Sequence, residues 1–131
     1  MGTVTSEAAL VRLRAVCLSY PLVEERLSHG EPTWFIGGKK TFVMFADRHH
    51  DDRTGFWCAA PPGVQEDRVA TDPTHFFRPP YVGGRGWLGV YLDVDDVDWD
   101  DVADIVDDAY RSVAGKRQIA TLDAQGGPEL R

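Results

Sequence analysis

The chain has 131 residues, of which 43% are hydrophobic and 11% aromatic, a composition that excludes a disordered chain and predicts a single folded domain over residues 1–131. Its 14 basic and 21 acidic side chains give a net charge of −7, which excludes a surface that is basic all over. No apolar run reaches the roughly 18 residues of a membrane-spanning helix, so we expect no membrane segment.

The cysteines and the N-terminus predict the cellular setting. Cys17 and Cys58 are too few and too far apart for a disulfide framework or a zinc site. The first residues lack the basic start and the apolar stretch of a signal peptide. We therefore expect a reduced, cytoplasmic protein that holds no cofactor and no metal.

The N-terminal part of the chain predicts one helix. In residues 5–19, apolar side chains such as Leu10, Leu13 and Cys17 recur at helical spacing and form one stripe. Pro21 ends this helix, and the polar residues 24–32 are interpreted as a connection.

Three strands are predicted next. Residues 33–36, 41–46 and 55–59 are β-type runs with aromatic and β-branched side chains. Gly37-Gly38 predicts a hairpin turn, because glycine adopts positive φ without steric cost. Residues 47–53 are too polar to be buried and predict a loop, so the three strands form an antiparallel meander.

A short helix, two strands and a long helix complete the predicted elements. Residues 64–71 predict the short helix, residues 75–77 a brief strand and residues 87–92 a further strand. Asp98 caps the final helix, and Gly115 either ends it or weakens it. We expect the tail to be frayed from about residue 124.

The order of these elements predicts the fold class. It reads α-β3-α-β2-α, and its apolar stripes are most simply buried by one antiparallel sheet covered by helices. The predicted fold is therefore a two-layer α+β domain.

The negative charge is concentrated in one segment. Between Asp93 and Asp108 lie nine aspartates and no basic residue, and the rest of the chain has 14 basic residues against 12 acidic ones. The run lacks the calcium-binding loop with its central glycine and terminal glutamate, so a helix cap and a solvated helix face are favoured over calcium binding. We expect one acidic face and a neutral or mildly basic remainder.

Several segments resemble the MmcQ/YjbR-like family in the order in which that family carries them. They are HGEPTWFIGGKKTF at residues 29–42, PPGVQ at 61–65, FFRPPYVGGRGWLGV at 76–90, and the closing acidic helix with Tyr110. The resemblance extends from the first helix to about Gln118. It implies an α-β3-α-β2-α domain with one antiparallel sheet.

The resemblance also bears on function. Many members of the family carry a DNA-binding label that rests on wing-like hairpins and structural analogy. The fold is similar to that of type III secretion chaperones, which bind other proteins. Fold analogy is weak evidence for function, and the family offers no catalytic residues to carry over.

Four cationic residues near the two glycine-rich turns form the candidate nucleic-acid-binding set, namely Lys39, Lys40, Arg78 and Arg85. Such side chains neutralise phosphates, and exposed aromatic rings beside them stack on bases. The simpler interpretation is that the lysines only solubilise a turn and that the neighbouring rings belong to the core.

An alternative site is a groove lined by the aromatic side chains of Trp34, Tyr81 and Trp87. Such a groove binds a protein or a small molecule, and its occupation is insensitive to salt. Binding to the cationic set, in contrast, weakens steeply with salt.

Two further arrangements are weaker candidates. The His-His-Asp-Asp loop at residues 49–52 carries metal-ligating side chains, but adjacent residues on a loop seldom give the required geometry, so a solvated loop is favoured. Whether the loop binds a metal is not decided by the sequence. His29 or His75 would serve as a base for a cysteine nucleophile, but both cysteines fall in predicted buried elements, where thiols are inert.

These observations favour a non-enzymatic binding domain. The chain has no Gly-x-Ser-x-Gly or P-loop pattern, and its Gly-x-Gly-x-x-Gly match at residues 84–89 runs into a predicted strand, which is the wrong context for a phosphate-binding helix N-terminus. Nucleic acid is the leading expected partner, and a protein or small-molecule ligand of the aromatic groove is the alternative. The sequence decides neither whether the four cations share one face nor the oligomeric state.

Overall fold

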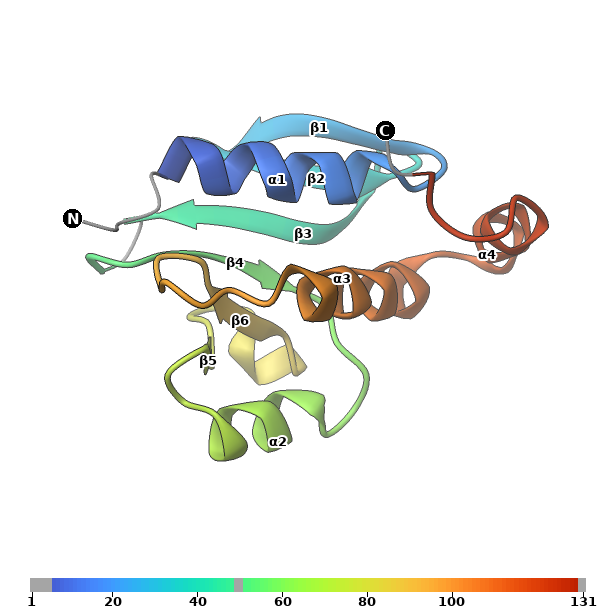
Figure 1. Cartoon of the computed structure of the whole chain (residues 1–131). Helices are drawn as coiled ribbons and strands as arrows, with labels where there is room; N and C mark the ends of the chain where they lie inside the picture. The colour runs from blue at the N-terminus through green and yellow to red at the C-terminus, as the bar shows by residue number, and fades with distance from the viewer. Residues whose placement is uncertain (1–5, 49–50, 130–131) are drawn as a thin grey trace.

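An antiparallel sheet forms the centre of the protein in a computed structural model that describes residues 6–48 and 51–129 (Figure 1). The 6-stranded sheet has the order β1-β2-β3-β4-β6-β5, and every neighbouring pair is antiparallel. Its strands are β1 (Val23–Ser28), β2 (Glu31–Ile36), β3 (Lys40–Asp47), β4 (Thr54–Cys58), β5 (Phe76–Phe77) and β6 (Leu88–Tyr91).

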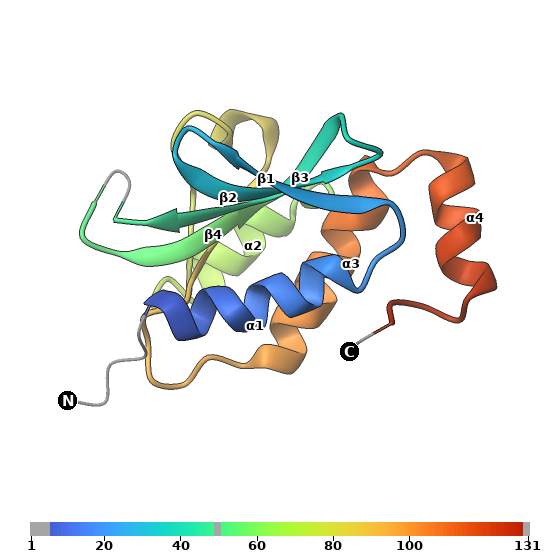
Figure 2. The same cartoon turned by 90° about the horizontal axis from the view of Figure 1, so that it is seen from above.

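The two longest helices lie against one face of this sheet, and a loop segment crosses the other face. The helical segments are α1 (Ser6–Leu18), α2 (Val64–Thr71), the 3-10 turn η1 (Gly83–Arg85), α3 (Trp99–Val113) and α4 (Lys116–Ala124). Figure 2 shows α1 on one side of the strands and the yellow segment around residue 80 on the other. In both views α4 stands at the side of the molecule.

The core lies between the sheet and the helices α1 and α3. Tyr20, Phe42 and Tyr110 form an aromatic cluster in which the Tyr20 and Tyr110 rings stack at 4.8 Å between centroids. The Tyr20 hydroxyl donates to Asp107 of α3 at 2.8 Å, and the Tyr110 hydroxyl donates to the Pro21 carbonyl at 2.8 Å. These bonds join the end of α1 to α3, and they satisfy the polar ends of large buried rings.

The α+β class with one antiparallel sheet is confirmed, but the order contains one strand more than predicted before α2. The interpretation of residues 24–32 as a connection is wrong, because β1 spans Val23–Ser28 and pairs with β2. β1 is an edge strand, and charged side chains are common on such strands. Glu25 turns toward α1 and bonds to Arg14, so the strand lacks the apolar alternation by which a sequence is recognised as a strand.

The end of the chain contains a second addition, the helix α4. Gly115 ends the long helix, since α3 stops at Val113 and α4 starts at Lys116. The predicted cap is confirmed, because the Asp98 carboxylate accepts from the backbone N–H groups of Asp100 and Asp101 at 3.1 Å. The described part of the tail returns to α1, where Glu129 N–H donates to the Ser19 carbonyl at 2.8 Å.

No helix among the described residues has both the length and the apolar character needed to cross a lipid bilayer.

Candidate binding groove

Three of the four predicted cations meet around one hollow, which we call the cationic hollow. It has a volume of about 490 Å³. Lys39 and Lys40 reach it from the β2–β3 turn, and Arg85 reaches it from η1. Its other lining residues are Ser28, His29, Thr41, Met44, Val82, Trp87 and Val113.

Two tight turns bring their side chains to this hollow. His29 and Gly30, with φ of 52° and 81°, form the two-residue connection between β1 and β2. Two successive positive φ values match the twist of a hairpin, and only glycine takes the second one without strain. Gly37 and Gly38, with φ of 63° and 75°, turn β2 into β3 and place the two lysines directly after the turn.

A buried glutamine anchors the segment that carries Arg85. Gln65 of α2 is 3% exposed, and its Nε2 donates to the Gly83 carbonyl at 2.8 Å and to the Trp87 carbonyl at 2.5 Å. The Arg85 guanidinium lies 5.3 Å from the centre of the Trp87 ring. This cation–π contact orients the guanidinium toward the hollow that Trp87 helps to line.

A second hollow, the aromatic hollow, joins the first. It has a volume of about 370 Å³ and shares Ser28, His29, Met44 and Val82 with the cationic hollow, so the two form one groove. The remaining lining residues are Glu31, Phe45, Trp57 and Tyr81. Tyr81 is 81% exposed and lies at the rim.

The cations at and beside the groove differ in their partners from five arginines elsewhere in the described chain. Ion pairs hold Arg14 to Glu25, Arg26 to Glu24, Arg53 to Asp93, Arg68 to Asp101, and Arg111 to Asp107 and Asp123. Within residues 6–48 and 51–129, no carboxylate lies within ion-pair distance of Lys39, Lys40, Arg78 or Arg85. Their charge is therefore available to a ligand.

Arg78 belongs to the same segment as Arg85 but does not line either hollow. Its side chain lies along the backbone of η1, so closely that a Cβ added to Gly83 would meet the Arg78 Cγ at 2.8 Å. Arg78 is exposed beside the groove. It would therefore contact only the edge of a ligand bound there.

Trp34 is a correction to the aromatic groove predicted from the sequence. Its side chain is 0% exposed, and its Nε1 donates to the Glu25 carboxylate at 3.0 Å. The same carboxylate accepts two bonds from the Arg14 guanidinium of α1, at 2.8 and 2.9 Å. These hydrogen bonds lower the pKa of Glu25, so Trp34 belongs to a structural network beneath α1.

Several lining residues were not predicted from the sequence. His29, Met44, Trp57 and Val82 come from four separate segments that only the folded sheet brings together. The one local signal was the His29-Gly30 pair between two strands, which favours a two-residue turn once residues 23–28 are recognised as a strand.

The cysteines are placed in the core. Cys17 and Cys58 are both 0% exposed, and burial raises the pKa of each thiol. In the described part of the chain no hydrogen bond joins a histidine to either sulfur. Neutral, enclosed thiols are poor nucleophiles, which disfavours the cysteine-nucleophile interpretation.

The His-His-Asp-Asp loop is described only in part. His49 and His50 lie outside the described residues, and the Asp51 carboxylate accepts from the Arg53 backbone N–H at 2.9 Å. Among the residues that are described, no group of three or more histidine, cysteine or acidic side chains is arranged to hold a metal ion.

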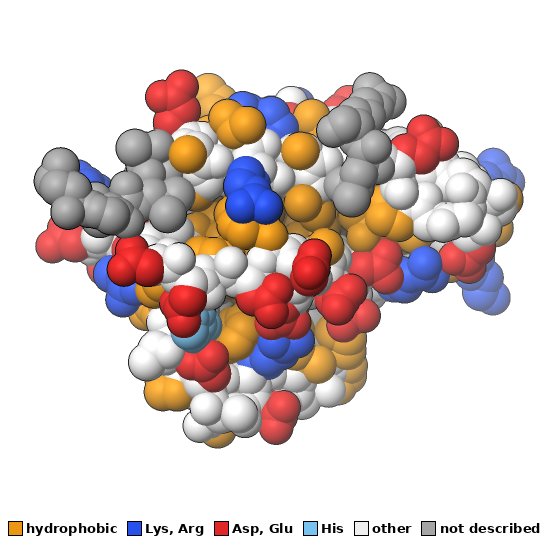
Figure 3. Space-filling model, in the orientation of Figure 1, with side chains coloured by type: hydrophobic (Ala, Val, Ile, Leu, Met, Phe, Trp, Pro, Cys, Tyr) orange, Lys and Arg blue, Asp and Glu red, His pale blue; other side chains and the backbone are white. Residues whose placement is uncertain are grey.

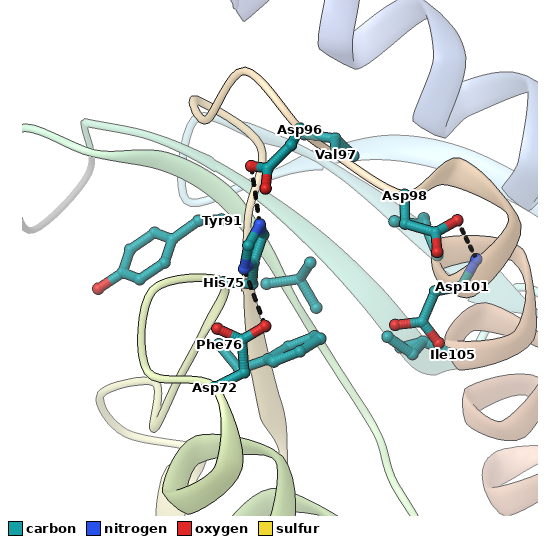
Figure 4. Close-up of a pocket in the computed structure, with 11 residues that line it drawn as sticks. Asp72, His75, Phe76, Tyr91, Asp96, Val97, Asp98, Asp101 and Ile105 are labelled. Carbon is teal, nitrogen blue, oxygen red and sulfur yellow. Dashed lines mark hydrogen bonds and ion pairs between the residues drawn. The ribbon is translucent and has the colours of Figure 1, made fainter.

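A third hollow, of about 200 Å³, contains the other described histidine (Figure 4). The His75 ring lies between two carboxylates, with Nδ1 2.9 Å from Asp72 and Nε2 2.9 Å from Asp96. The hydrogen bond to Asp72, followed by that to Asp96, raises the pKa of His75. In its charged form the imidazole donates to both partners and ties the end of α2 to the β6–α3 connection.

The aspartate-rich segment lies away from the groove. Figure 3 shows acidic side chains gathered over the β6–α3 connection and α3, on the face from which α1 is seen. The loop segment that carries η1 lies on the opposite side of the sheet (Figure 2). The predicted acidic face is present, and three of the four predicted cations line a single hollow away from it.

The structure is that of a small α+β domain, in which one antiparallel sheet supports a concave surface that is cationic at one end and aromatic at the other. The YjbR family model matches residues 18–112, and the chain belongs to this family. No curated protein shows significant sequence similarity to this chain. The chain is similar in fold to the crystal structure of Deinococcus radiodurans protein DR2400, a DUF419 family-model domain, with a TM-score of 0.69, 18% sequence identity, and coverage of 100% of this chain and 94% of that one.

Proposed function

We propose that the groove binds single-stranded nucleic acid and that the domain acts by binding rather than by catalysis. One observation carries the proposal: Lys39, Lys40 and Arg85, which have no carboxylate partner among the described residues, line one hollow beside an adjoining aromatic hollow. A nucleotide unit has the same two parts, an anionic phosphate and an aromatic base.

The number of cations favours a single strand over a duplex. A site on duplex DNA commonly neutralises about 6–10 phosphates, whereas this groove offers three cations, with His29 and Arg78 nearby. A single strand needs fewer phosphate contacts when its bases stack on aromatic rings. The net charge of −7 opposes binding elsewhere on the molecule, so the groove would be the place of contact.

Stacking would take place at the aromatic hollow. The Tyr81 side chain is 81% exposed at its rim, and Trp57 lines it from β4. A base unstacked from a flexible strand presents its whole ring face, and stacking on an aromatic side chain contributes about 1–3 kcal/mol for each base. A base within a duplex presents no such face.

A small anionic ligand with a hydrophobic part is the second candidate. Phe45 and Met44 add apolar surface to the aromatic hollow, whose volume of about 370 Å³ falls in the range of small-molecule sites. Such a ligand would place its acidic group between Lys40 and Arg85, and its affinity would not increase with oligonucleotide length.

Fluorescence anisotropy with labelled oligonucleotides tests the proposal. Single-stranded DNA of increasing length and matched duplexes are titrated at low and at physiological salt. We expect tighter binding to the single strand and a linear loss of log affinity with log salt concentration. Replacing Lys39 and Lys40 by alanine removes two phosphate contacts and should reduce the salt slope by about 1.4, since each contact contributes about 0.7 on single strands.

The chain contains a matched control for the arginine of the groove. Arg85 lies 5.3 Å from the Trp87 ring centre, and Arg12 of α1 lies 4.6 Å from the Trp99 ring centre. Arg85→Ala should weaken binding, while Arg12→Ala, which removes the same charge and the same kind of contact elsewhere, should not. Equal effects of the two substitutions, or no binding even at low salt, would overturn the proposal.

A further inference from the structure

Exposed apolar side chains gather around the free edge of the sheet. Val11 and Leu18 of α1 are 56% and 39% exposed, and Leu22 and Leu27 at β1 are 59% and 74% exposed. Of the large hydrophobic side chains that are exposed among the described residues, only Tyr81 lies elsewhere. Figure 3 shows hydrophobic side chains at the surface over α1 and toward β1. Such a patch on a small domain marks an interaction surface.

The backbone of β1 has hydrogen-bonding groups that point away from the sheet. β1 ends the strand order, and no described strand pairs with its outer edge. The closing pair of the two-residue hairpin is Ser28 with Glu31, and the Gly37 N–H donates to the Leu22 carbonyl at 2.8 Å. Both observations place the ladder bonds to β2 at even-numbered residues. The N–H and C=O groups of Val23, Glu25 and Leu27 therefore point outward.

The sequence of β1 is complementary to itself in antiparallel pairing. A two-fold axis at Glu25, perpendicular to the sheet, places Val23 opposite Leu27 of the second copy, and Glu24 opposite Arg26 of the second copy. The outward groups of Val23, Glu25 and Leu27 then meet the same outward groups of the second strand. Moving the axis to Glu24 or to Arg26 would place like charges opposite each other, which is unfavourable.

The residue on the axis is already neutralised. The two Glu25 carboxylates would face each other across the new strand pair. Each one, however, is already bound by the Arg14 guanidinium at 2.8 Å and by the Trp34 indole N–H at 3.0 Å. Arg14 reaches β1 from α1, and Val11 and Leu18 lie three residues before it and four residues after it on the same side of that helix. The two α1 helices would therefore face each other with these side chains between them.

We propose that a second copy of this chain pairs with the outer edge of β1, with β1 antiparallel to β1 and the two-fold axis at Glu25. The two sheets then form one continuous sheet, and both grooves open on the same face of it. The pairing covers a free strand edge that has neither a proline nor a bulge within Val23–Ser28. It does not depend on what the groove binds.

A charge-exchange series tests the pairing. Light scattering and sedimentation measure the molar mass across a range of concentrations, and we expect it to rise from 14.6 kDa to twice that value. Glu24→Arg and Arg26→Glu each place like charges opposite one another at two positions, so each should raise the dimer dissociation constant about tenfold. The double variant E24R/R26E restores opposite charges and should bring the constant back near that of the original protein.

Amide hydrogen exchange measured by NMR tests the register. The amides of Glu24, Arg26 and Ser28 should be protected at every concentration, because they bond to β2. The amides of Val23, Glu25 and Leu27 should gain protection only as the dimer forms.

Three results would overturn the proposal. The first is a protein that remains monomeric at every concentration, which would leave the edge to a strand of another protein. The second is protection of the Val23, Glu25 and Leu27 amides in the monomer, which would mean that the chain covers its own edge. The third is a dimer in which these three amides exchange freely, which would place the interface elsewhere.

Discussion

Gln65 should contribute more to stability than its exposed neighbours on α2, because its side chain is the buried link between that helix and the groove. Gln65→Leu keeps a similar volume but removes both donated hydrogen bonds, at 2.8 and 2.5 Å. The Trp87 carbonyl then remains in a buried region without a donor, while the Gly83 carbonyl keeps the backbone N–H of Gly86 at 3.0 Å. An unsatisfied buried carbonyl costs about 1–3 kcal/mol and a lost hydrogen bond about 0.5–1.5 kcal/mol, so the substitution should lower the free energy of unfolding by about 2–4 kcal/mol.

Urea denaturation followed by tryptophan fluorescence measures this loss, which corresponds to a fall in Tm on the order of 10 °C. Gln65→Glu separates the loss of the donor from a change in side-chain shape, because glutamate has nearly the same shape as glutamine. Its protonated carboxyl keeps one donor, whereas its carboxylate faces two carbonyl oxygens, so this variant should lose stability as the pH rises. Affinity of the groove for an oligonucleotide should fall in both variants, because η1 loses its anchor.

The reasoning fails if Gln65→Leu unfolds within about 0.5 kcal/mol of the original protein. That result would mean that water or a small shift of η1 satisfies the Trp87 carbonyl. Glu66→Leu, on the exposed side of the same helix, is the matched control and should change stability by less than this amount.

Three further predictions concern the fold around the groove. The pKa of His75 is raised in the folded protein, so the stability that its charged ring contributes is complete below about pH 6.5. This contribution disappears as the pH rises through the folded-state pKa. In denaturant titrations, His75→Gln should therefore destabilise the protein at pH 6 and have little effect at pH 9. Gly55→Ala would place a Cβ against the backbone carbonyl of Val90 and should lower the free energy of unfolding, measured by thermal denaturation, by about 1–3 kcal/mol. A loss below about 0.5 kcal/mol would show that β4 and β6 can separate to accept the Cβ. Trp34→Phe removes the hydrogen bond from the indole N–H to Glu25 and should lower the free energy of unfolding by about 1–2 kcal/mol without changing oligonucleotide affinity. A loss of affinity would show that Trp34 belongs to the binding surface.

The last long helix shows what local sequence can determine. Asp98 is followed by two aspartates in the first turn, and the apolar residues Val102, Ile105 and Val106 recur with helical spacing. Each of these signals acts over a few residues, so the cap, the start and the buried face of α3 could be predicted without knowing its surroundings. The glycine turn between β2 and β3 is a second example, since positive φ is a property of the residue itself.

The edge strand shows where local sequence was insufficient. Glu24, Glu25 and Arg26 have the composition of a loop. They form a strand because their backbone pairs with β2 and because Arg14 neutralises Glu25. Trp34 was misplaced for a related reason. An aromatic residue on a strand can face a helix layer or a groove, and the direction depends on what packs against each face of the sheet.

The α+β class, the long helices, the glycine turn between β2 and β3 and the separate acidic segment could be predicted from the sequence, because each depends on neighbours along the chain. That Lys39, Lys40 and Arg85 meet at one hollow with His29 and Trp87 became visible only in the folded chain. These residues come from two hairpin turns and from the η1 segment, and their distances depend on strand order and on the buried bonds of Gln65. Long-range packing carries that information, and no window of sequence contains it.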